Sequence, residues 1–363
     1  MKFVDNFQDS NLAVKLVRRI AQTSTKHINL MEFCGGHTHA IMRYGIRELL
    51  PVTVTLNSGP GCPVCVTANA DLDKVIAMAS LPGVITATFG DMIRVPGSYS
   101  SLQQAKAEGA DVYVIYSATD AIEIARNNPQ KSIILIGIGF ETTAPTIAAA
   151  VLQAQQENIS NFHVLSLLKR TPPVIKALLD TGEVRIDGII GPGHVSTIIG
   201  SKPYEFIPRD YGIGCVISGF EPLDILLCIE KLVQQSESKL AQVEITYRRA
   251  VKPSGNRKAL ELLKTVFDPG KADWRGIGII PDSGWKLKAE YQCFDADRAF
   301  TVSLKPVKEP EGCRCGDIIR GTVTPLECKL FSTACTPESP AGPCMVSSEG
   351  ACSAYYNYRI DHV

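Results

Sequence analysis

The chain has 363 residues, and this length allows for two or three domains. Its apolar fraction of 45% and charged fraction of 20% are ordinary for a soluble globular protein. Basic and acidic residues number 37 each, which argues against nucleic acid or a membrane surface as an electrostatic partner. The longest apolar run, near Ile133–Phe140, is too short to span a bilayer, and residues 1–11 lack an apolar signal core. We therefore expect a cytoplasmic protein.

Helical spacing of apolar residues predicts a first helix over Asn11–Gln22, followed by a short strand over Asn29–Phe33. Strands and helices then alternate. The further predicted strands are Val52–Leu56, Val84–Phe89, Val112–Tyr116, Ser132–Phe140, His163–Leu168, Gly188–Ile190, Cys215–Ile217 and Val243–Arg248. The further predicted helices are Ile41–Leu49, Leu72–Met78, Ala118–Asn127, Thr146–Gln156, Pro173–Leu179, Leu223–Gln234 and Asn256–Phe267.

Nearly continuous apolar strands separated by helices indicate parallel sheets that are covered on both faces. The expected fold is α/β, with two Rossmann-like parallel-sheet domains that face a cleft and a C-terminal cysteine-rich domain. The expected boundaries are 1–30 for a helical segment packed with the C-terminal domain, 31–146 and 147–238 for the two α/β domains, and 239–363 for an iron–sulfur domain.

Cysteine usage is the most informative feature of the composition. The chain has 12 cysteines and no signal peptide is expected, so metal binding or catalysis is favoured over structural disulfides. Six of the cysteines gather near the C-terminus among Gly, Pro and Ser, with the spacing C-x-C-x12-C-x6-C-x8-C-x7-C: Cys313, Cys315, Cys328, Cys335, Cys344 and Cys352. Too few apolar residues accompany them to build a core. An iron–sulfur cluster is favoured; zinc and adventitious disulfides are the alternatives, but zinc sites usually show paired C-x2–4-C knuckles.

Two cysteine motifs follow predicted strands. Cys34-Gly-Gly-His37 comes after the Asn29–Phe33 strand, and a thiol at a helix N-terminus is a good ligand or nucleophile. His37 is close enough in sequence to share a metal with Cys34. The second motif, Gly59-Pro-Gly-Cys62-Pro-Val-Cys65, has the spacing of a redox-active or metal-binding pair. The simpler alternative for both is a Gly-rich turn with buried cysteines.

Two further strand ends carry polar side chains without cysteine: Glu141, Thr142 and Thr143 in one turn, and His194 and Ser196 in the other. Helix capping would explain Thr142 or Ser196 taken singly. Carboxyl ends of parallel strands meet at one edge of a sheet, however, and ligands bind there. The recurrence of such residues at four strand ends predicts one shared site in the cleft.

These motifs resemble those of the HypD family of hydrogenase maturation proteins. The matching segments are Cys34–Ala40, Gly59–Cys65, Gly139–Thr143, Gly193–Ser196, and Cys344–Cys352 followed by Ala354–Tyr356. The resemblance runs from about residue 31 to 358. It implies a scaffold on which the Fe(CN)2CO unit of [NiFe] hydrogenases is assembled, with a HypC-type chaperone as a 1:1 partner of an otherwise monomeric chain and a HypE-type protein as the source of cyanide.

The resemblance also implies roles for individual cysteines. Cys313, Cys328, Cys335 and Cys352 match the ligands of a [4Fe-4S] cluster, while Cys315 and Cys344 match a pair that can form a disulfide beside it. Cys34 matches the thiol that holds the iron of the Fe(CN)2CO unit, with a partner cysteine as a second ligand. Cys62 and Cys65 match a second redox pair. His37, Glu141, Thr142, Thr143, His194 and Ser196 are expected to line the site and orient incoming ligands.

Two other classes of protein fit the same residues. One is a cluster-dependent disulfide reductase similar to ferredoxin–thioredoxin reductase, which would use the cysteines without holding iron at Cys34. The other is a zinc-stabilised nucleotide-binding protein with phosphate at its helix N-termini. Cys215, Cys228 and Cys293 have no metal-like companion in the sequence and are expected to be structural.

Overall fold

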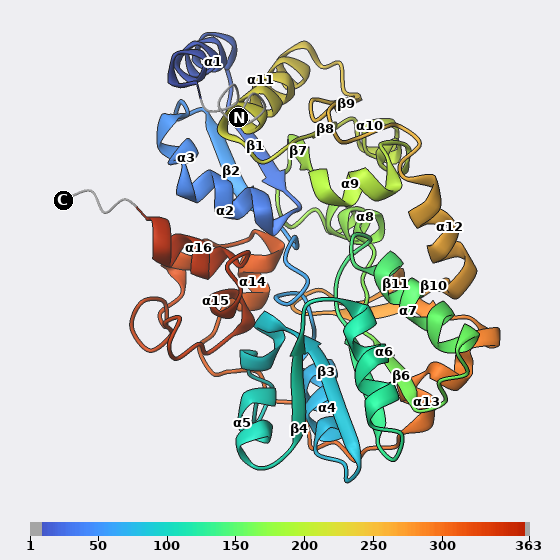
Figure 1. Cartoon of the computed structure of the whole chain (residues 1–363). Coiled ribbons are helices and arrows are strands. Elements are labelled where there is room, and N and C mark those ends of the chain that lie inside the picture. Colours follow the sequence, from blue (N-terminus) through green and yellow to red (C-terminus); the bar gives the residue numbers. More distant parts are fainter. Residues whose placement is uncertain (1–8, 360–363) are drawn as a thin grey trace.

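The computed structural model describes residues 9–359. Two parallel β-sheets lie one above the other in Figure 1, and the C-terminal segment, coloured red, packs at their common side. The α/β class with two parallel sheets and a cysteine-rich C-terminal region is therefore confirmed.

The first sheet has the strand order β2-β1-β7-β8-β9, and every neighbouring pair is parallel. Its strands are β1 (Ile28–Glu32), β2 (Val54–Ser58), β7 (Gly188–Gly191), β8 (Gly214–Ile217) and β9 (Val243–Ile245). The helical segments around it are α1 (Ser10–Thr23), α2 (Gly35–Arg43), α3 (Ile46–Leu49), α8 (Thr171–Thr181), α9 (Gly193–Ile199), η3 (Lys202–Tyr204), α10 (Phe206–Tyr211) and α11 (Pro222–Ser238). Leu30, Ile190 and Val216 from three adjacent strands are fully buried in one core with α11, as expected for a sheet covered by helices.

The second sheet has the strand order β4-β3-β5-β6 and is also parallel throughout. Its strands are β3 (Val84–Phe89), β4 (Asp111–Ile115), β5 (Ser132–Gly137) and β6 (Phe162–Ser166). The accompanying helices are α4 (Asn69–Ala79), η2 (Gly90–Arg94), α5 (Leu102–Ala107), α6 (Ala118–Asn127) and α7 (Ala144–Gln156). Side chains of β3 and β5 pack with α6 and α7 on one face and with α4 and α5 on the other.

The sheets divide the chain differently from the expected boundary at 146/147. Strands β5 and β6, which lie on opposite sides of that boundary, are neighbours in the second sheet. The first sheet begins with β1 and β2 and resumes only at β7, so the second sheet is inserted into it. Periodicity finds strands but does not show which strands pair, and for this reason the sequence suggested two consecutive halves.

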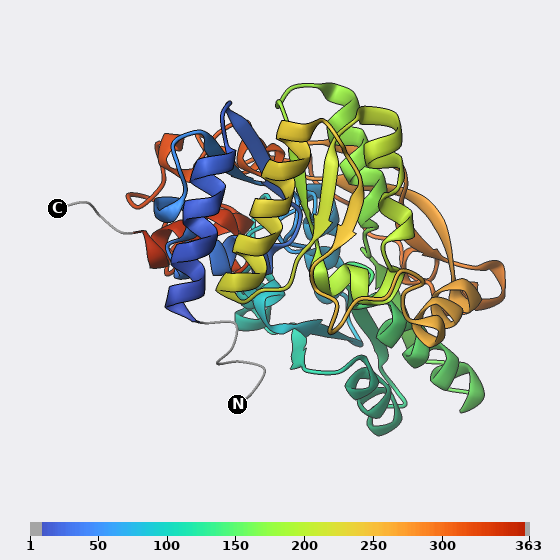
Figure 2. The same ribbon diagram turned by 90° about the horizontal axis from the view of Figure 1, so that it is seen from above.

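The N-terminal helix α1 lies along α11 on the first sheet (Figure 2), whereas the sequence analysis had placed it with the C-terminal domain. Asp9 caps α1 by accepting hydrogen bonds from the backbone N–H groups of Asn11 (2.8 Å) and Leu12 (3.2 Å). Leu16 and Ile20 then point into the first core.

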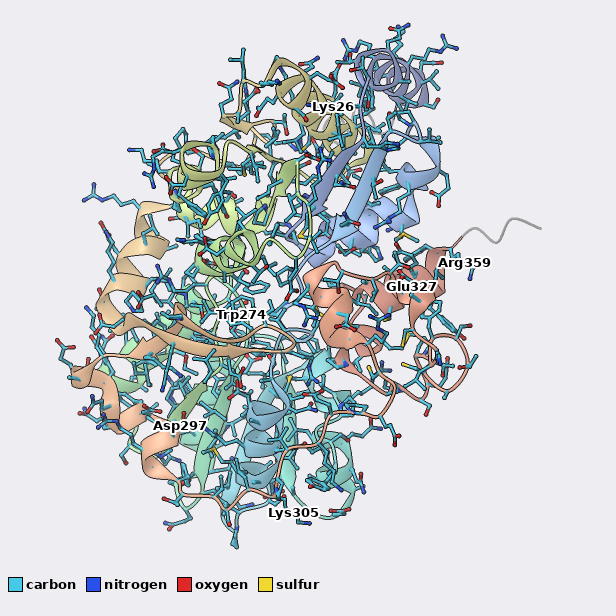
Figure 3. The ribbon with its side chains drawn as sticks, turned by 180° about the vertical axis from the view of Figure 1, so that it is seen from behind. Lys26, Trp274, Asp297, Lys305, Glu327 and Arg359 are labelled. Atoms are coloured by element: carbon cyan, nitrogen blue, oxygen red, sulfur yellow. A yellow bond between two sulfur atoms is a disulfide. The ribbon has the colours of Figure 1, made fainter. Side chains whose placement is uncertain are left out.

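Residues 239–300 do not form one unit with the cysteine region, in contrast to the expected 239–363 domain, although Gly276 packs against Gly316 of that region. Strand β9 extends the first sheet, and α12 (Arg257–Val266) packs on α7. A hairpin that was not predicted follows: β10 (Phe267–Trp274) pairs with β11 (Gly278–Leu287). The chain continues through η4 (Ala289–Phe294) and α13 (Ala296–Ala299). Trp274, at the centre of Figure 3, is fully buried and donates to the Ser283 hydroxyl at 2.8 Å.

The cysteine region contains four short helical segments: α14 (Cys315–Arg320), η5 (Pro325–Glu327), α15 (Pro343–Val346) and α16 (Ala351–Tyr358). Helix α16 packs against α2, and α14 packs against β2. The region therefore lies directly beside the strand ends that carry the first two cysteine motifs.

Two local differences from the predicted elements affect the site. Helix α2 begins at Gly35, so the Cys34 motif is itself the first turn of a helix that was expected only from Ile41. Strand β5 ends at Gly137 because Gly139 has a φ of 149°, which turns the chain toward α7. Within residues 9–359, no helix has the length and apolar character needed to cross a membrane.

Candidate functional site

The carboxyl ends of both sheets face the middle of the molecule, where the cysteine region also lies (Figure 1). Each sheet has one point at which the connections from two neighbouring strands run to opposite sides of the sheet. This point lies between β1 and β7 in the first sheet and between β3 and β5 in the second. Such switch points are the usual ligand sites of open parallel sheets. Cys34 and His194 follow β1 and β7, and Thr142 follows β5, so all three lie at switch points.

Cys34 is the N-cap residue of α2 and is buried. Its sulfur accepts hydrogen bonds from the backbone N–H groups of Gly36 and His37, in the first turn of the helix. Burial raises the pKa of the Cys34 thiol, and the nearby carboxylates of Glu349 and Glu32 raise it further. Cys34 is therefore a protonated thiol at neutral pH until a cation binds to the sulfur.

A buried carboxyl group holds the Cys34 backbone in place. Glu32 accepts a hydrogen bond from the Cys34 N–H at 2.8 Å and another from the Thr38 hydroxyl. Burial raises the pKa of Glu32 from 4.5 to about 7, although these hydrogen bonds act in the opposite direction. The end of β1 and the start of α2 are thus tied together around Cys34.

His37, Phe220 and His194 form a stack across the switch point of the first sheet. The Phe220 ring lies 4.6 Å from the His37 ring and 3.9 Å from the His194 ring, between centroids. Burial lowers the pKa of His37 to about 4, so this ring is neutral at pH 7. Its Nε2 donates to the Gly219 carbonyl at 3.0 Å, and its buried Nδ1 has no hydrogen-bond partner within residues 9–359. His37 therefore offers one free acceptor.

The second cysteine motif contacts the first directly. Cys62 and Cys65 form a disulfide with a Cα–Cα distance of 5.2 Å. The Gly35 N–H donates to the Gly61 carbonyl at 3.0 Å, and a Cβ on Gly61 would overlap the backbone of Cys34. Gly61 is thus required for the close approach of the two loops, and the sequence-based prediction that the motifs converge is met for Cys34 and Cys62.

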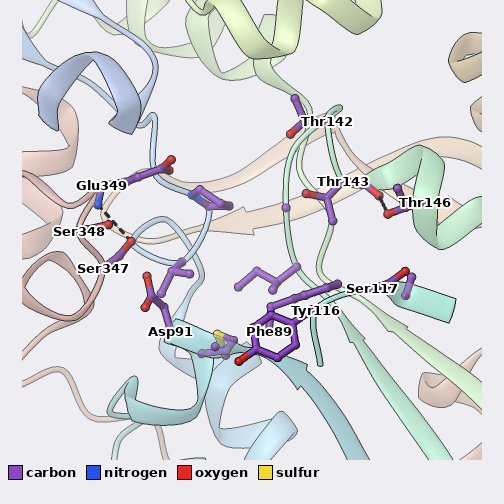
Figure 4. Close-up of a pocket in the computed structure, with 17 residues that line it drawn as sticks. Phe89, Asp91, Tyr116, Ser117, Thr142, Thr143, Thr146, Ser347, Ser348 and Glu349 are labelled. Atoms are coloured by element: carbon purple, nitrogen blue, oxygen red, sulfur yellow. Dashed lines mark hydrogen bonds between the residues drawn. The ribbon is translucent and has the colours of Figure 1, made fainter. Parts of the chain in front are cut away.

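A cavity of about 630 Å³ opens at the switch point of the second sheet (Figure 4). Its wall combines hydroxyl groups and carboxylates with apolar side chains: Pro63, Val64, Phe89, Asp91, Met92, Tyr116, Ser117, Thr142, Thr143, Thr146, Ser347, Ser348 and Glu349. Tyr116 is 95% exposed at its mouth. Glu349 also packs against Gly35, so the cavity reaches the first turn of α2.

Two residues that were expected to line the site are used elsewhere. Glu141 is buried and accepts hydrogen bonds from the Thr171 N–H (2.8 Å) and hydroxyl (2.9 Å) at the start of α8. The Ser196 hydroxyl is buried and donates to the Pro192 carbonyl at 2.7 Å. Neither side chain is part of the cavity wall, whereas Thr142 and Thr143 are.

The six C-terminal cysteines line one small cavity, together with Ile318, Phe331, Gly342 and Met345. Cys313 is half-buried and the other five are buried, and none of the six is disulfide-bonded. The Cys335 sulfur accepts a hydrogen bond from the Ala341 N–H at 3.3 Å. A Cβ on Gly342 would lie 2.9 Å from the Cys313 sulfur, so glycine is needed there for the cysteines to converge.

Cys344 connects this region to the other cysteine motif. It contacts Cys315 on one side and also lines a second small cavity with Cys62, Cys65 and Glu349. The Cys65 sulfur lies 3.8 Å from the carbonyl oxygen of Pro343, the residue before Cys344. Cys344 is therefore shared by the cavity of the cysteine region and the cavity at Cys62–Cys65, and the Cys62 loop in turn contacts the Cys34 backbone through Gly61.

The donor set of the cysteine region differs from that of a single metal ion. Within residues 9–359, no three Cys, His, Asp or Glu side chains are arranged as ligands of one ion. Six thiols from separate turns nevertheless surround one cavity, and thiolates with N–H···S hydrogen bonds are the ligand chemistry of iron–sulfur clusters. The chemistry of these donors fits the ligands of such a cluster.

Sequence reasoning missed three residues of this site: Glu32, Phe220 and Glu349. Glu32 precedes Cys34 by two residues, but it lies within the predicted strand and was therefore not considered as a site residue. Phe220 and Glu349 come from segments distant in the chain, and their contacts with His37 and Gly35 depend on how those segments pack. Glu349 lies within the Cys344–Cys352 segment that matches the family, and this match could have pointed to it.

The fold and site define a class of α/β protein in which two parallel sheets converge on a cysteine-rich region. Comparison with known proteins identifies the family. The HypD model, described as "Hydrogenase formation hypA family", matches residues 11–359. The chain belongs to the HypD family, and the resemblance found in its motifs is confirmed.

Curated relatives match over almost the entire chain. The hydrogenase maturation factor HypD of Cupriavidus necator is 45% identical, over 99% of this chain and 97% of the relative. The hydrogenase expression/formation protein HupD of Azotobacter chroococcum is 47% identical, with the same coverage. HypD of Escherichia coli K12 is 41% identical, over 99% of this chain and 98% of the relative.

Proposed function

We propose that this protein is a redox-active iron–sulfur scaffold on which the Fe(CN)2CO unit of [NiFe] hydrogenases is assembled. Membership of the HypD family supports a role in hydrogenase maturation. The observation that carries the more detailed proposal is the position of Cys344, which lines both the cavity of the cysteine region and the cavity at the Cys62–Cys65 disulfide.

Cys34 is proposed to hold the iron of the unit under assembly, together with a cysteine of the HypC-type chaperone. Low-spin iron that carries cyanide and CO is soft, so a thiolate is a fitting anchor. Binding requires the Cys34 thiol to lose its proton, and the N–H groups of Gly36 and His37 stabilise the thiolate that results. The free Nδ1 acceptor of His37 can orient a protonated ligand or partner group nearby.

The cavity of about 630 Å³ is proposed as the entry route for ligands. Its hydroxyl groups, including those of Thr142 and Thr143, can donate to the nitrogen of cyanide or to a carrier group, and Glu349 connects it to the α2 turn. A HypE-type protein would deliver cyanide here. The resemblance supports both partners and a cytoplasmic 1:1 complex with the chaperone.

The cysteine pairs are proposed to move electrons by thiol–disulfide exchange. The Cys344 thiolate attacks one sulfur of the Cys62–Cys65 bond, which breaks as a mixed disulfide forms and the other cysteine leaves as a thiolate. Cys315 then attacks Cys344, so that Cys62 and Cys65 are both reduced and Cys315–Cys344 is oxidised. Two electrons move, and the protons of Cys315 and Cys344 pass to the thiolates released.

By the family resemblance, the residues that would hold a [4Fe-4S] cluster are Cys313, Cys328, Cys335 and Cys352, all of which line the small cavity of the cysteine region. When bound, the cluster would supply electrons one at a time. Cyanide transfer needs electrons because the carbon must leave its carrier sulfur as a nucleophilic ligand.

Infrared spectroscopy tests the proposal. The protein is co-purified with its chaperone under anaerobic conditions, and CN and CO stretching bands are expected. Cys34→Ala should abolish these bands, while Cys293→Ala, which changes an exposed cysteine far from the motifs in sequence, should retain them. Bands of equal intensity in the Cys34→Ala protein would remove Cys34 from its role.

A cluster-dependent disulfide reductase is the second candidate, because the Cys62–Cys65 disulfide lines a small cavity together with the free thiol of Cys344. A reductase would turn over a disulfide substrate alone when given an electron donor. A scaffold would be nearly inactive in this assay and would acquire its iron only with its partner. Colour separates both from the zinc alternative, since a zinc protein is colourless and an iron–sulfur protein is brown.

A further inference from the structure

Arg275 is a buried cation next to the cysteine region. It lies in the turn between β10 and β11 and is only 3% exposed. Its guanidinium donates to the Thr67 carbonyl (3.1 Å), to Asn69 Oδ1 and to the Glu309 carboxylate (2.8 Å). These partners hold the side chain in one position, because they come from two distant segments of the chain.

The backbone places this turn against the first cysteines of the region. Gly276, with a φ of 74°, packs so closely on Gly316 that a Cβ on Gly316 would lie 3.0 Å from the Gly276 Cα. Gly316 follows Cys315 at the start of α14. The Arg275 charge lies within electrostatic range of Cys313 and Cys315 and weakly favours their thiolate forms.

The ion-pair partner of Arg275, Glu309, neutralises the charge of the guanidinium only in part. The Glu309 side chain is 62% exposed, so water and salt weaken its interaction with the guanidinium. A buried charge without full compensation is costly unless other negative charge lies near it. Thiolates around an iron–sulfur cluster at Cys313 and its neighbours would supply further negative charge near Arg275.

We propose that Arg275 is a positioning residue that sets the reduction potential of the cluster by stabilising the added negative charge of its reduced state. This inference rests on the proposed function. The step is the addition of one electron from a reductant such as dithionite, with no bond formed or broken. Charge and solvent exposure near the sulfurs are among the factors that determine the potentials of such clusters.

The test is an EPR-monitored redox titration of the full-length, anaerobically purified protein. Arg275→Gln removes the charge and should lower the equilibrium constant for reduction about tenfold, a shift of about 59 mV to more negative potential for one electron. Arg275→Lys keeps the charge and should restore most of the wild-type potential. Glu309→Gln removes the opposing carboxylate and should shift the potential in the positive direction, by about twofold to threefold in the equilibrium constant.

Arg320→Gln is the matched control. Arg320 donates to the carbonyl of Gly276, so it touches the same turn, but its partly exposed guanidinium pairs with Asp317 and Glu183. This variant should leave the potential unchanged.

The outcomes separate this inference from the proposed function. A wild-type protein without iron and sulfide would overturn the cluster and the role of Arg275 together. Clusters in all variants with equal potentials would overturn only the role of Arg275. If Arg275→Gln cannot retain a cluster, Glu309→Gln decides: a positive shift supports the inference, and no shift or a negative one contradicts it, because general destabilisation does not account for an increase in potential.

Discussion

The two-sheet body and the cysteine region are ordered by different means. In the body, fully buried Ile, Leu, Val and Ala side chains of the strands pack against helices. In the cysteine region, six cysteines surround one small cavity, and the apolar side chains beside them, such as Ile319 and Val346, share a buried cluster with Trp274 of the body. The body therefore owes its stability to apolar burial, whereas the order of the cysteine region is expected to depend both on its packing against the body and on what its sulfurs bind.

The largest effect is expected from removing one sulfur of the cysteine region, which should affect that region and leave the two-sheet body intact. Cys335→Ala removes a sulfur that accepts the Ala341 N–H, and nearly all cluster iron should be lost while the helical circular dichroism of the body remains. Cys228→Ala is the control, since Cys228 is buried in α11 and its thiol donates a hydrogen bond to the Val216 carbonyl. Iron and sulfide analysis decides, and full iron retention in Cys335→Ala would contradict the assignment.

The buried carboxyl of Glu32 should make the stability of the body depend on pH. Its pKa is raised in the folded state, so its contribution to stability is complete below 4.5 and is lost as pH rises to about 7. The unfolding free energy of the wild type relative to Glu32→Gln should fall by about 3 kcal/mol across that interval. Chemical denaturation at pH 4.5, 6 and 8 measures this difference, in which the opposite titration of His37 cancels. A constant difference would show that Glu32 does not titrate in this range.

Gly61 joins the two cysteine loops and should not tolerate a side chain. Gly61→Ala forces a Cβ against the Cys34 backbone, and we expect a loss of about 2 kcal/mol in unfolding free energy. Gly90→Ala is the matched control, because its added Cβ meets no atom within 4 Å and its change should stay within about 0.5 kcal/mol. Similar losses in both variants would mean that loop contact is unimportant.

Glu141 should prove to be a structural residue. Glu141→Gln weakens the hydrogen bonds to Thr171 and should cost about 1 kcal/mol in stability. The CN and CO bands of the complex should remain at their wild-type frequencies. A frequency shift in this variant, but not in Thr171→Val, would return Glu141 to the ligand site.

The sequence predicted the individual elements better than their arrangement. Apolar runs identified the strands of both sheets, since burial on both faces gives a clear signal. The insertion of the second sheet into the first is not visible in periodicity, because pairing depends on long-range contacts such as β1 with β7. The β10–β11 hairpin was missed because its Pro269, Gly270 and charged residues obscure alternation.

For the site, the motifs predicted which segments come together, but they did not predict whether each polar side chain faces the site or makes a structural hydrogen bond. Cys34 and Cys62 were expected to converge and do so, because both follow adjacent parallel strands. Glu141 and Ser196 stand beside the site in sequence, yet their oxygens satisfy local backbone and hydroxyl groups. Whether a polar side chain faces a cavity or caps a helix depends on rotamer and packing, which spacing does not determine.

The most direct test of the account is whether Cys344 connects the cysteine region to the Cys62–Cys65 disulfide. The anaerobic protein would be reduced through its cluster with a low-potential donor and its thiols labelled, and the labelled residues identified by mass spectrometry. In wild type and in Cys293→Ser, label should appear on Cys62 and Cys65; in Cys344→Ser both should remain unlabelled. Equal labelling of Cys62 and Cys65 with and without Cys344 would contradict the proposed sulfur path.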